Sequence, residues 1–193
     1  TFDNDFEIQL YTEILLKFKL RTGDIIEEKD LKDILLQNQI YEAKNTSLRL
    51  LSKRMRTEKE IIDKLKQKKF EDSIITQTIN ELKRINLIND EEFVDKFINN
   101  TITLNKNYGR YALLNKLIKF GISKNLANER ISKLLTDNDE YETALSAAKK
   151  KLLNLKRYDE SKKIQRLISF LSGRGYNWDI IKKVLSELKI NYE

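Results

Sequence analysis

The residue types and spacing of this sequence best support anion binding. The residues concerned are clusters of lysine and arginine with tyrosines among them. The formal net charge is +7, and residues 44–70, 101–136 and 161–193 carry ten, seven and seven basic residues against three, one and three acidic ones. Arginine binds phosphate or carboxylate through paired N–H donors. The candidate residues for binding a partner or DNA are Arg49, Lys53, Arg54, Arg56, Lys106, Arg110, Lys162, Lys163, Arg166 and Arg174.

Aromatic residues lie between these basic residues, and an exposed ring can stack on a nucleobase. The tyrosines concerned are Tyr108, Tyr111, Tyr158 and Tyr176, although Tyr176 also belongs to a column of apolar residues and is expected in the core. Any single basic block is equally well explained as a solvated helix face. Three blocks at a near-constant interval favour a basic stripe, whose partner is nucleic acid, a protein, or both.

The sequence contains few of the residue types that enzymes use for catalysis. Cysteine and histidine are both absent, which excludes disulfides, thiol nucleophiles, imidazole bases, zinc fingers and Ser-His-Asp triads. The five glycines do not form a phosphate-binding loop motif. The acidic runs at 90–92 and 137–140 fall where helices are expected to begin, and acids are favoured there by the helix dipole. We therefore expect no catalytic residue, no cofactor and no metal ion.

The composition predicts an all-α protein, because proline is absent and 35% of the residues are charged. Apolar residues recur in columns at helical spacing, with Leu65, Leu117 and Leu171 at one position and offsets of 52 and 54 residues. Four positions later stand Lys69, Gly121 and Gly175, which are expected to end helices in a left-handed conformation. The sequence thus predicts an elongated, curved array of tandem three-helix repeats.

The repeats are expected at 41–89, 90–138 and 139–193, after an N-terminal extension at 1–40. A capping box of Thr57 and Glu60 is expected, and Asp72, Ser123 and Asn177 are expected as N-caps. In the extension, Phe6, Ile8 and Leu10 alternate as in a short strand. The predicted helices are 27–37 (which may continue into the first repeat), 41–54, 57–68, 72–85, 91–105, 108–120, 124–135, 140–156, 161–172 and 178–189.

Four ordered segments resemble the RecX family of regulatory proteins. LLSKRMRTEKEIIDKL (50–65) is similar to the family's opening motif, with Arg54, Arg56, Thr57 and Glu60 at its Arg-x-Arg-[Ser/Thr]-x-x-Glu core. LINDEEFV (87–94), GRYALLNKLIKFGIS (109–123) and FLSGRGYNWDIIKKVL (170–185) resemble its later segments. One departure is Lys69, which stands where the family often has glycine. Together the segments cover residues 43–190 and are specific as a set.

The resemblance implies a bacterial modulator of the RecA recombinase that binds the RecA–DNA filament in its groove and inhibits ATPase and strand exchange. It also implies no catalysis, weak binding to single- or double-stranded DNA, a cytoplasmic location and a monomer. The residues themselves leave two alternatives open: a helical DNA- or RNA-binding protein that needs no recombinase, and a general interaction scaffold. No apolar run reaches the about 18 residues that a membrane span needs, so no membrane partner is expected. The first residue is Thr1 rather than methionine, which leaves open whether an N-terminal piece is missing.

Overall fold

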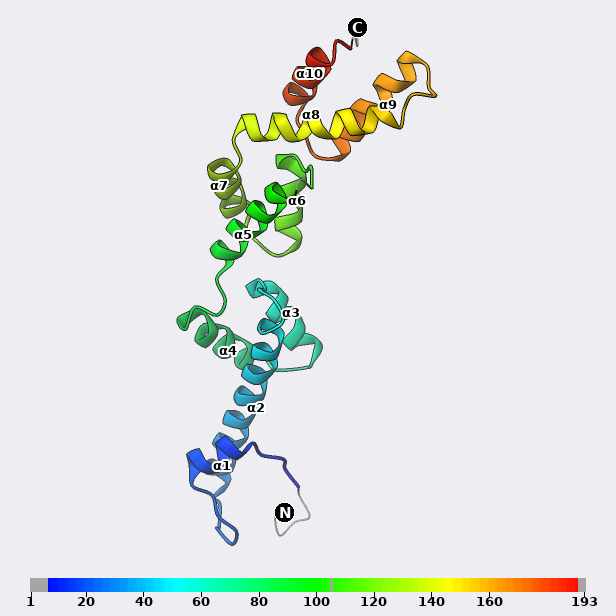
Figure 1. The fold of residues 1–193 in the computed structure, drawn as a ribbon. Coiled ribbons are helices and arrows are strands. Elements are labelled where there is room, and N and C mark those ends of the chain that lie inside the picture. The colour runs from blue at the N-terminus through cyan, green and yellow to red at the C-terminus, as the bar shows by residue number, and fades with distance from the viewer. Residues whose placement is uncertain (1–6, 105, 191–193) are drawn as a thin grey trace. The chain divides into compact units, whose positions relative to one another are not determined.

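The computed structural model describes residues 7–104 and 106–190, and all regular secondary structure in these ranges is helical (Figure 1). The prediction of an all-α chain built from three-helix repeats is confirmed. The chain divides into two compact units, residues 1–89 (unit 1) and 90–193 (unit 2). The helices are α1 Thr12–Phe18, α2 Glu28–Leu51, α3 Glu58–Gln67, α4 Asp72–Arg84, α5 Asp90–Thr103, α6 Arg110–Lys119, α7 Lys124–Leu134, α8 Asp137–Leu153, α9 Glu160–Gly173 and α10 Trp178–Glu187.

Unit 1 is organised around the long helix α2, which packs against α1, α3 and α4. The two helices expected on either side of residue 40 form one continuous helix, the continuation that the sequence left open. The core of the unit joins α2 to α3 and α4, and each helix turns one apolar face inward, as the helical spacing predicts. The buried residues of this core are Ile40, Ala43, Ile61, Leu65, Ile74, Ile75, Ile79, Leu82 and Ile88.

The N-terminal segment before α1 differs from the expected strand. Residues 7–11 adopt neither helix nor strand, and Phe6 lies outside the described residues. The segment is instead held against α2 by Asn38, which accepts from the Tyr11 amide at 3.0 Å and donates to the Gln9 carbonyl at 3.1 Å. An isolated segment has no neighbouring strand to hydrogen-bond with, so its backbone groups bond to a side-chain amide instead.

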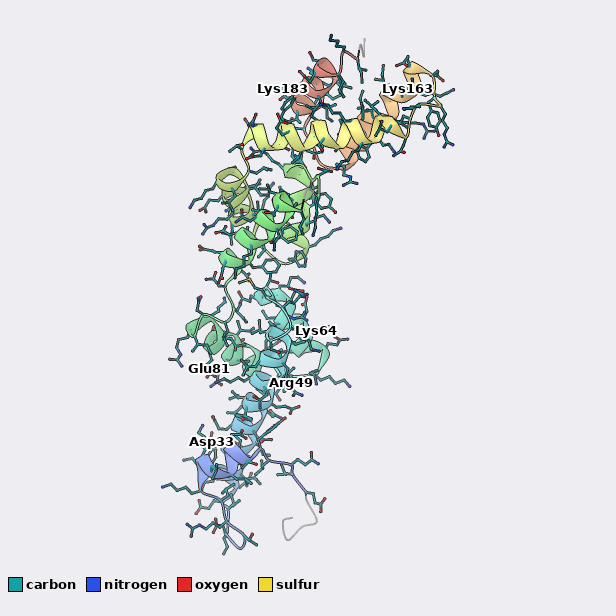
Figure 2. All side chains as sticks on the ribbon, viewed as in Figure 1. Asp33, Arg49, Lys64, Glu81, Lys163 and Lys183 are labelled. Atoms are coloured by element: carbon teal, nitrogen blue, oxygen red, sulfur yellow. The ribbon has the colours of Figure 1, made fainter. Side chains whose placement is uncertain are left out.

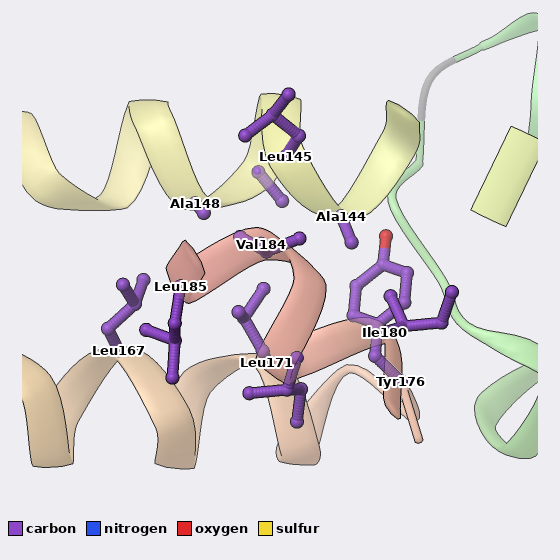
Figure 3. Close-up of a cluster of buried hydrophobic side chains, with 11 residues drawn as sticks. Ala144, Leu145, Ala148, Leu167, Leu171, Tyr176, Ile180, Val184 and Leu185 are labelled. Carbon is purple, nitrogen blue, oxygen red and sulfur yellow. The ribbon is translucent and has the colours of Figure 1, made fainter. Parts of the chain in front are cut away.

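Unit 2 contains α5 to α10, and Figure 3 shows the core formed by its last three helices, whose labelled side chains point toward one another. Leu145 and Ala148 of α8 and Leu167 and Leu171 of α9 belong to one buried cluster, and Figure 3 shows Val184 and Leu185 of α10 between the other two helices. Tyr176 belongs to this core, as predicted, and is only 3% exposed. In the other half of the unit, α7 packs against α5 and α6.

Most turns and helix caps inside the repeats agree with the predictions from the sequence. Lys69, Gly121 and Gly175 all have positive φ angles, of 65°, 89° and 81°. The capping box of Thr57 and Glu60 is present, and Ser123 and Asn177 cap α7 and α10 through their side chains. The prediction for Asp72 is wrong: Asp72 is the first residue of α4, and Glu71 is its N-cap without a side-chain hydrogen bond.

One helix begins earlier than its apolar pattern indicated. Helix α8 was expected from residue 140 but begins at Asp137, because Thr136 and Asp139 form a second capping box. Its N-terminal turn is therefore set by polar residues that precede the apolar ones. This start places Glu140 inside the first turn of α8, where its side chain is buried.

Candidate nucleic-acid and partner interface

The ten basic residues expected to bind a partner fall into three groups according to what their side chains contact. Arg54 and Arg56 lie in the turn between α2 and α3 and both face Glu60. Arg54 contacts the two carboxylate oxygens of Glu60 at 3.1 and 2.5 Å. Arg56 is 14% exposed, and its Nε donates to the Leu50 carbonyl at 3.1 Å. These contacts stabilise the turn between α2 and α3.

The Glu60 carboxylate has a lowered pKa in this turn. Burial raises the pKa, but hydrogen bonds from Arg54 and the Thr57 amide and the charges of Arg54 and Arg56 outweigh that effect. Glu60 is therefore both the capping residue of α3 and the anchor of two arginines. The donors of Arg54 that face Glu60 are already used within the chain.

Arg110 is the corresponding anchor of unit 2. Its Nε donates to Glu140 at 2.7 Å, and its Nη2 reaches both the Leu135 carbonyl at 2.7 Å and Asp137 at 2.8 Å. The backbone amide of Arg110 also donates to Glu140, at 2.9 Å. The Glu140 side chain is 1% exposed and that of Arg110 is 27% exposed, so a buried carboxylate and a partly buried guanidinium connect the start of α6 with the start of α8.

A second group is paired only at the surface. Lys162 lies 3.1 Å from Asp159, and Lys163 lies 2.5 Å from Glu160, each within the first turn of α9. Exposed pairs of this kind contribute about 0–1 kcal/mol and exchange readily with another anion. Both lysines therefore remain available to a ligand.

The third group consists of Arg49, Lys53, Lys106, Arg166 and Arg174. Among the residues that the structure describes, none of the five has a carboxylate within ion-pair distance. Arg49 and Lys53 line a hollow of about 440 Å³ in unit 1, together with Lys64 and Lys68. Lys106 and Arg174 are 68 positions apart in the sequence, yet Arg174 Nη1 donates to the Lys106 carbonyl at 3.1 Å.

Arg174 is the centre of a series of cation–aromatic contacts in unit 2. Its guanidinium carbon lies 5.8 Å from the ring centroid of Tyr108 and 5.1 Å from that of Phe170. On one side, Lys116 Nζ lies 4.4 Å from the Tyr108 ring. On the other, Lys151 Nζ lies 5.1 Å from the Phe170 ring. Cations and rings thus alternate from α6 to α8.

The series continues along α9 to the loop before it. Lys151, Phe170 and Arg166 line one hollow of about 640 Å³, together with Lys162. Arg166 lies 4.2 Å from the ring centroid of Tyr158, and Arg157 lies 5.2 Å from the same ring. We call this set the cation–aromatic series: Lys116, Tyr108, Arg174, Phe170, Lys151, Arg166, Tyr158 and Arg157.

The positive potential along the series affects its own titratable ring. A hydrogen bond from Arg157 to the Tyr158 hydroxyl (3.2 Å) and the charges of Arg157 and Arg166 lower the pKa of Tyr158. The same field that stabilises a phenolate stabilises a phosphate oxygen, because both are oxyanions. Rings that can stack and cations without carboxylates together suit a single-stranded nucleic acid.

Sequence reasoning named Arg166, Arg174, Tyr108 and Tyr158 but missed the other four members of the series. Arg166, Phe170 and Arg174 stand at intervals of four residues, which places them on one helix face, and this spacing was a usable signal. Lys116, Lys151 and Arg157 come from other elements. Only the packing of those elements brings them to the α9 face.

The described residues contain no group of three or more Asp, Glu, His or Cys side chains arranged to hold a metal ion. Within the same part of the chain, no helix has the length and apolar character needed to cross a bilayer.

Comparisons with known proteins agree on one family. Residues 43–82 match the family model "RecX, first three-helix domain" and residues 138–185 match "RecX, third three-helix domain". Among curated proteins, "Regulatory protein RecX" of Clostridioides difficile is 36% identical over 99% of this chain and 88% of its own length. "Regulatory protein RecX" of Clostridium acetobutylicum is 34% identical, over 96% and 87%.

Solved structures give the same result. "Crystal structure of regulatory protein RecX" matches 96% of this chain and 92% of that chain with a TM-score of 0.82 at 21% identity, a likeness of fold. "Crystal structure of RecX from Lactobacillus salivarius" matches 80% of this chain and 99% of that chain with a TM-score of 0.73 at 26% identity. Relatives above 30% identity over nearly the whole chain, with matching domains at both ends, establish that this chain belongs to the RecX family of regulatory proteins.

Proposed function

We propose that this protein binds the RecA–DNA nucleoprotein filament and inhibits the recombinase's ATPase and strand exchange, without catalysis of its own. Membership of a family named for regulation supports the regulatory role. The recombinase as target comes from the resemblance of the four sequence segments. Since RecA and DNA occur in the bacterial cytoplasm, the proposal places the protein there, acting as a monomer.

The cation–aromatic series is the observation that carries the DNA half of this proposal. Five cations of the series, from Lys116 to Arg157, lie within 6 Å of three aromatic rings. Cations neutralise backbone phosphates, and each base stacked on a ring contributes about 1–3 kcal/mol. A strand held in a filament offers both groups, phosphates and base faces.

Tandem three-helix domains also support repeated contacts. The basic residues without carboxylate partners occur in both units, with Arg49 and Lys53 in unit 1 and Lys106, Arg166 and Arg174 in unit 2. Weak contacts within one chain add as avidity when the target is itself repetitive. A filament is such a target, which supports inhibition at a low ratio of this protein to recombinase.

The second candidate is a nucleic-acid-binding protein that acts without a recombinase, and the same series favours it. The two candidates differ in which ligand binds more tightly. The proposed function expects stronger binding to a recombinase-coated oligonucleotide than to the bare strand. The alternative expects the bare strand to bind at least as tightly.

The experiment compares the full chain with Lys151→Gln/Arg166→Gln on both ligands over a range of salt concentrations. Each phosphate contact removed is expected to reduce the salt slope on bare single strands by about 0.7. The control is Lys96→Gln/Lys133→Gln, which removes the same charge from α5 and α7 of the same unit. A coated strand bound no more tightly than the bare one would refute the proposed function in favour of the alternative.

A further inference from the structure

Unit 1 contains a basic hollow that the DNA half of the proposal does not use. It lies beside the C-terminal ends of α2 and α3 and contains four cations: Arg49 of α2, Lys53 in the turn after it, Lys64 of α3 and Lys68 at the C-cap of α3. Thr46, Leu50 and Gln67 complete its wall. Arg49 and Lys64 are labelled in Figure 2 on these two helices.

The hollow has an unsatisfied polar group in its wall. Thr46 is 5% exposed, and its Oγ1 is buried without a hydrogen-bond partner. A buried hydroxyl left unpaired costs about 1–3 kcal/mol, so such groups are uncommon in folded proteins. The neighbouring Ser47 shows the ordinary solution, since its hydroxyl donates to the Ala43 carbonyl at 2.8 Å.

The charge of the hollow is uncompensated. None of its lining residues is acidic, and within the described part of the chain its four cations have no carboxylate at ion-pair distance. The contrast is with Arg54, a few residues further on, whose guanidinium is paired with Glu60. The hollow of about 440 Å³ therefore combines four cations with one apolar residue, Leu50, and two polar uncharged residues, Thr46 and Gln67.

These features favour a carboxylate of a peptide over a nucleic-acid phosphate. No aromatic ring lines the hollow, so a base has nothing to stack on. A peptide can bring a carboxylate for the cations together with an apolar side chain for Leu50, whereas a phosphate brings charge alone.

We propose that this hollow binds an acidic segment of a protein partner, with a carboxylate side chain between the four cations. That the partner is the recombinase rests on the proposed function; the binding of an acidic peptide does not. The two units then divide the filament between them, with unit 2 contacting nucleic acid and unit 1 contacting protein.

The test is calorimetric titration of the full chain with a short capped peptide of aspartate and glutamate containing one leucine. The comparison probe is an oligothymidylate of equal charge. We expect Arg49→Gln/Lys64→Gln to weaken the peptide at least about tenfold, equivalent to about 1.4 kcal/mol, while the oligonucleotide changes less than about twofold. Thr46→Val retains the shape of the wall and removes only the enclosed hydroxyl, so we expect this variant to bind the peptide within about twofold of the parent.

The matched control is Lys32→Gln/Lys59→Gln, which removes two charges from the same helices outside the hollow, where each lysine pairs with an exposed carboxylate. The control is expected to bind the peptide as the parent does. Absence of peptide binding by the parent, or equal losses for peptide and oligonucleotide, would overturn the site. Recombinase inhibition is measured separately. Peptide binding without inhibition would refute only the assignment of the recombinase as partner. Inhibition without peptide binding would refute only the proposed peptide site in the hollow.

Discussion

Gly109 and Gly175 touch backbone to backbone, although 66 positions of sequence separate them. A Cβ on Gly109 would lie 2.3 Å from the Gly175 carbonyl oxygen, closer than any real contact. The Gly109 amide donates to the Arg174 carbonyl at 2.9 Å, and the Tyr111 amide donates to Gly175 at 3.2 Å. This contact joins the start of α6 to the turn after α9 and places Tyr108 beside Arg174, the centre of the cation–aromatic series.

Gly175→Ala is expected to destabilise unit 2 by about 3 kcal/mol or more. A Cβ would lie 2.2 Å from the Ala112 amide nitrogen, and the φ angle of +81° is itself strained for alanine. Urea unfolding measures the change. The control is Gly173→Ala, where a Cβ meets nothing within 4 Å at the end of α9. Equal stability of the two variants would contradict the close contact.

Arg110→Ala is expected to cost about 3–5 kcal/mol of stability, because it leaves the buried Glu140 carboxylate without a cation and with only the backbone amide of residue 110 as donor. The comparison is Lys96→Ala, which breaks an exposed pair with Glu92 on α5 and is expected to cost about 0.5 kcal/mol or less. Chemical denaturation of both variants gives the two values. A small loss at Arg110 would show that Glu140 finds another partner or reaches solvent.

The lowered pKa of Glu60 makes stability depend on pH in a defined direction. A carboxylate with a folded-state pKa below its unfolded value stabilises the fold above the unfolded pKa, and this contribution is lost as the pH falls through the folded value. The free energy of unfolding should therefore decrease from about pH 5 downward. Glu60→Gln and Arg54→Gln should both flatten this decrease, leaving the share of other lowered carboxylates such as Asp159. An unchanged profile in either variant would contradict the assignment.

Tyr158 reports directly on the cation–aromatic series. Its pKa is lowered by the hydrogen bond from Arg157 and by the charges of Arg157 and Arg166. Arg166→Gln should raise this pKa toward the ordinary tyrosine value, and NMR titration of the labelled tyrosine ring measures it. Lys133→Gln on α7 removes the same charge elsewhere in unit 2 and should leave Tyr158 unchanged. If Arg166→Gln left the pKa of Tyr158 unchanged, the contact between these two side chains would be contradicted.

The local features of this fold follow from the sequence because they depend on residues close together in the chain. Lys69, Gly121 and Gly175 end helices as expected, since a left-handed residue followed by an apolar one is a local signal. The capping box of Thr57 and Glu60 spans four residues and could equally be predicted from the sequence. The N-cap prediction for Asp72 failed because Glu71, a residue type without N-cap preference, occupies that position, and Asp72 lies in the first turn of α4.

The roles of the basic residues did not follow from the sequence, because they depend on contacts between distant segments. Arg110 and Arg166 are both arginines in basic blocks, yet Arg110 faces a carboxylate 30 positions away and Arg166 faces a tyrosine ring. Charge counting treats the two alike. Only the packed helices show which guanidinium groups are used within the chain and which remain open to a ligand.

The most direct test of the central claim is the single-stranded-DNA-dependent ATPase of the cognate RecA, with this protein titrated well below one per recombinase monomer. The account predicts inhibition at these low ratios, weakened in the Lys151→Gln/Arg166→Gln variant and retained in the Lys96→Gln/Lys133→Gln control. Undiminished ATPase activity at equimolar protein, with the filament shown to be assembled, would contradict it.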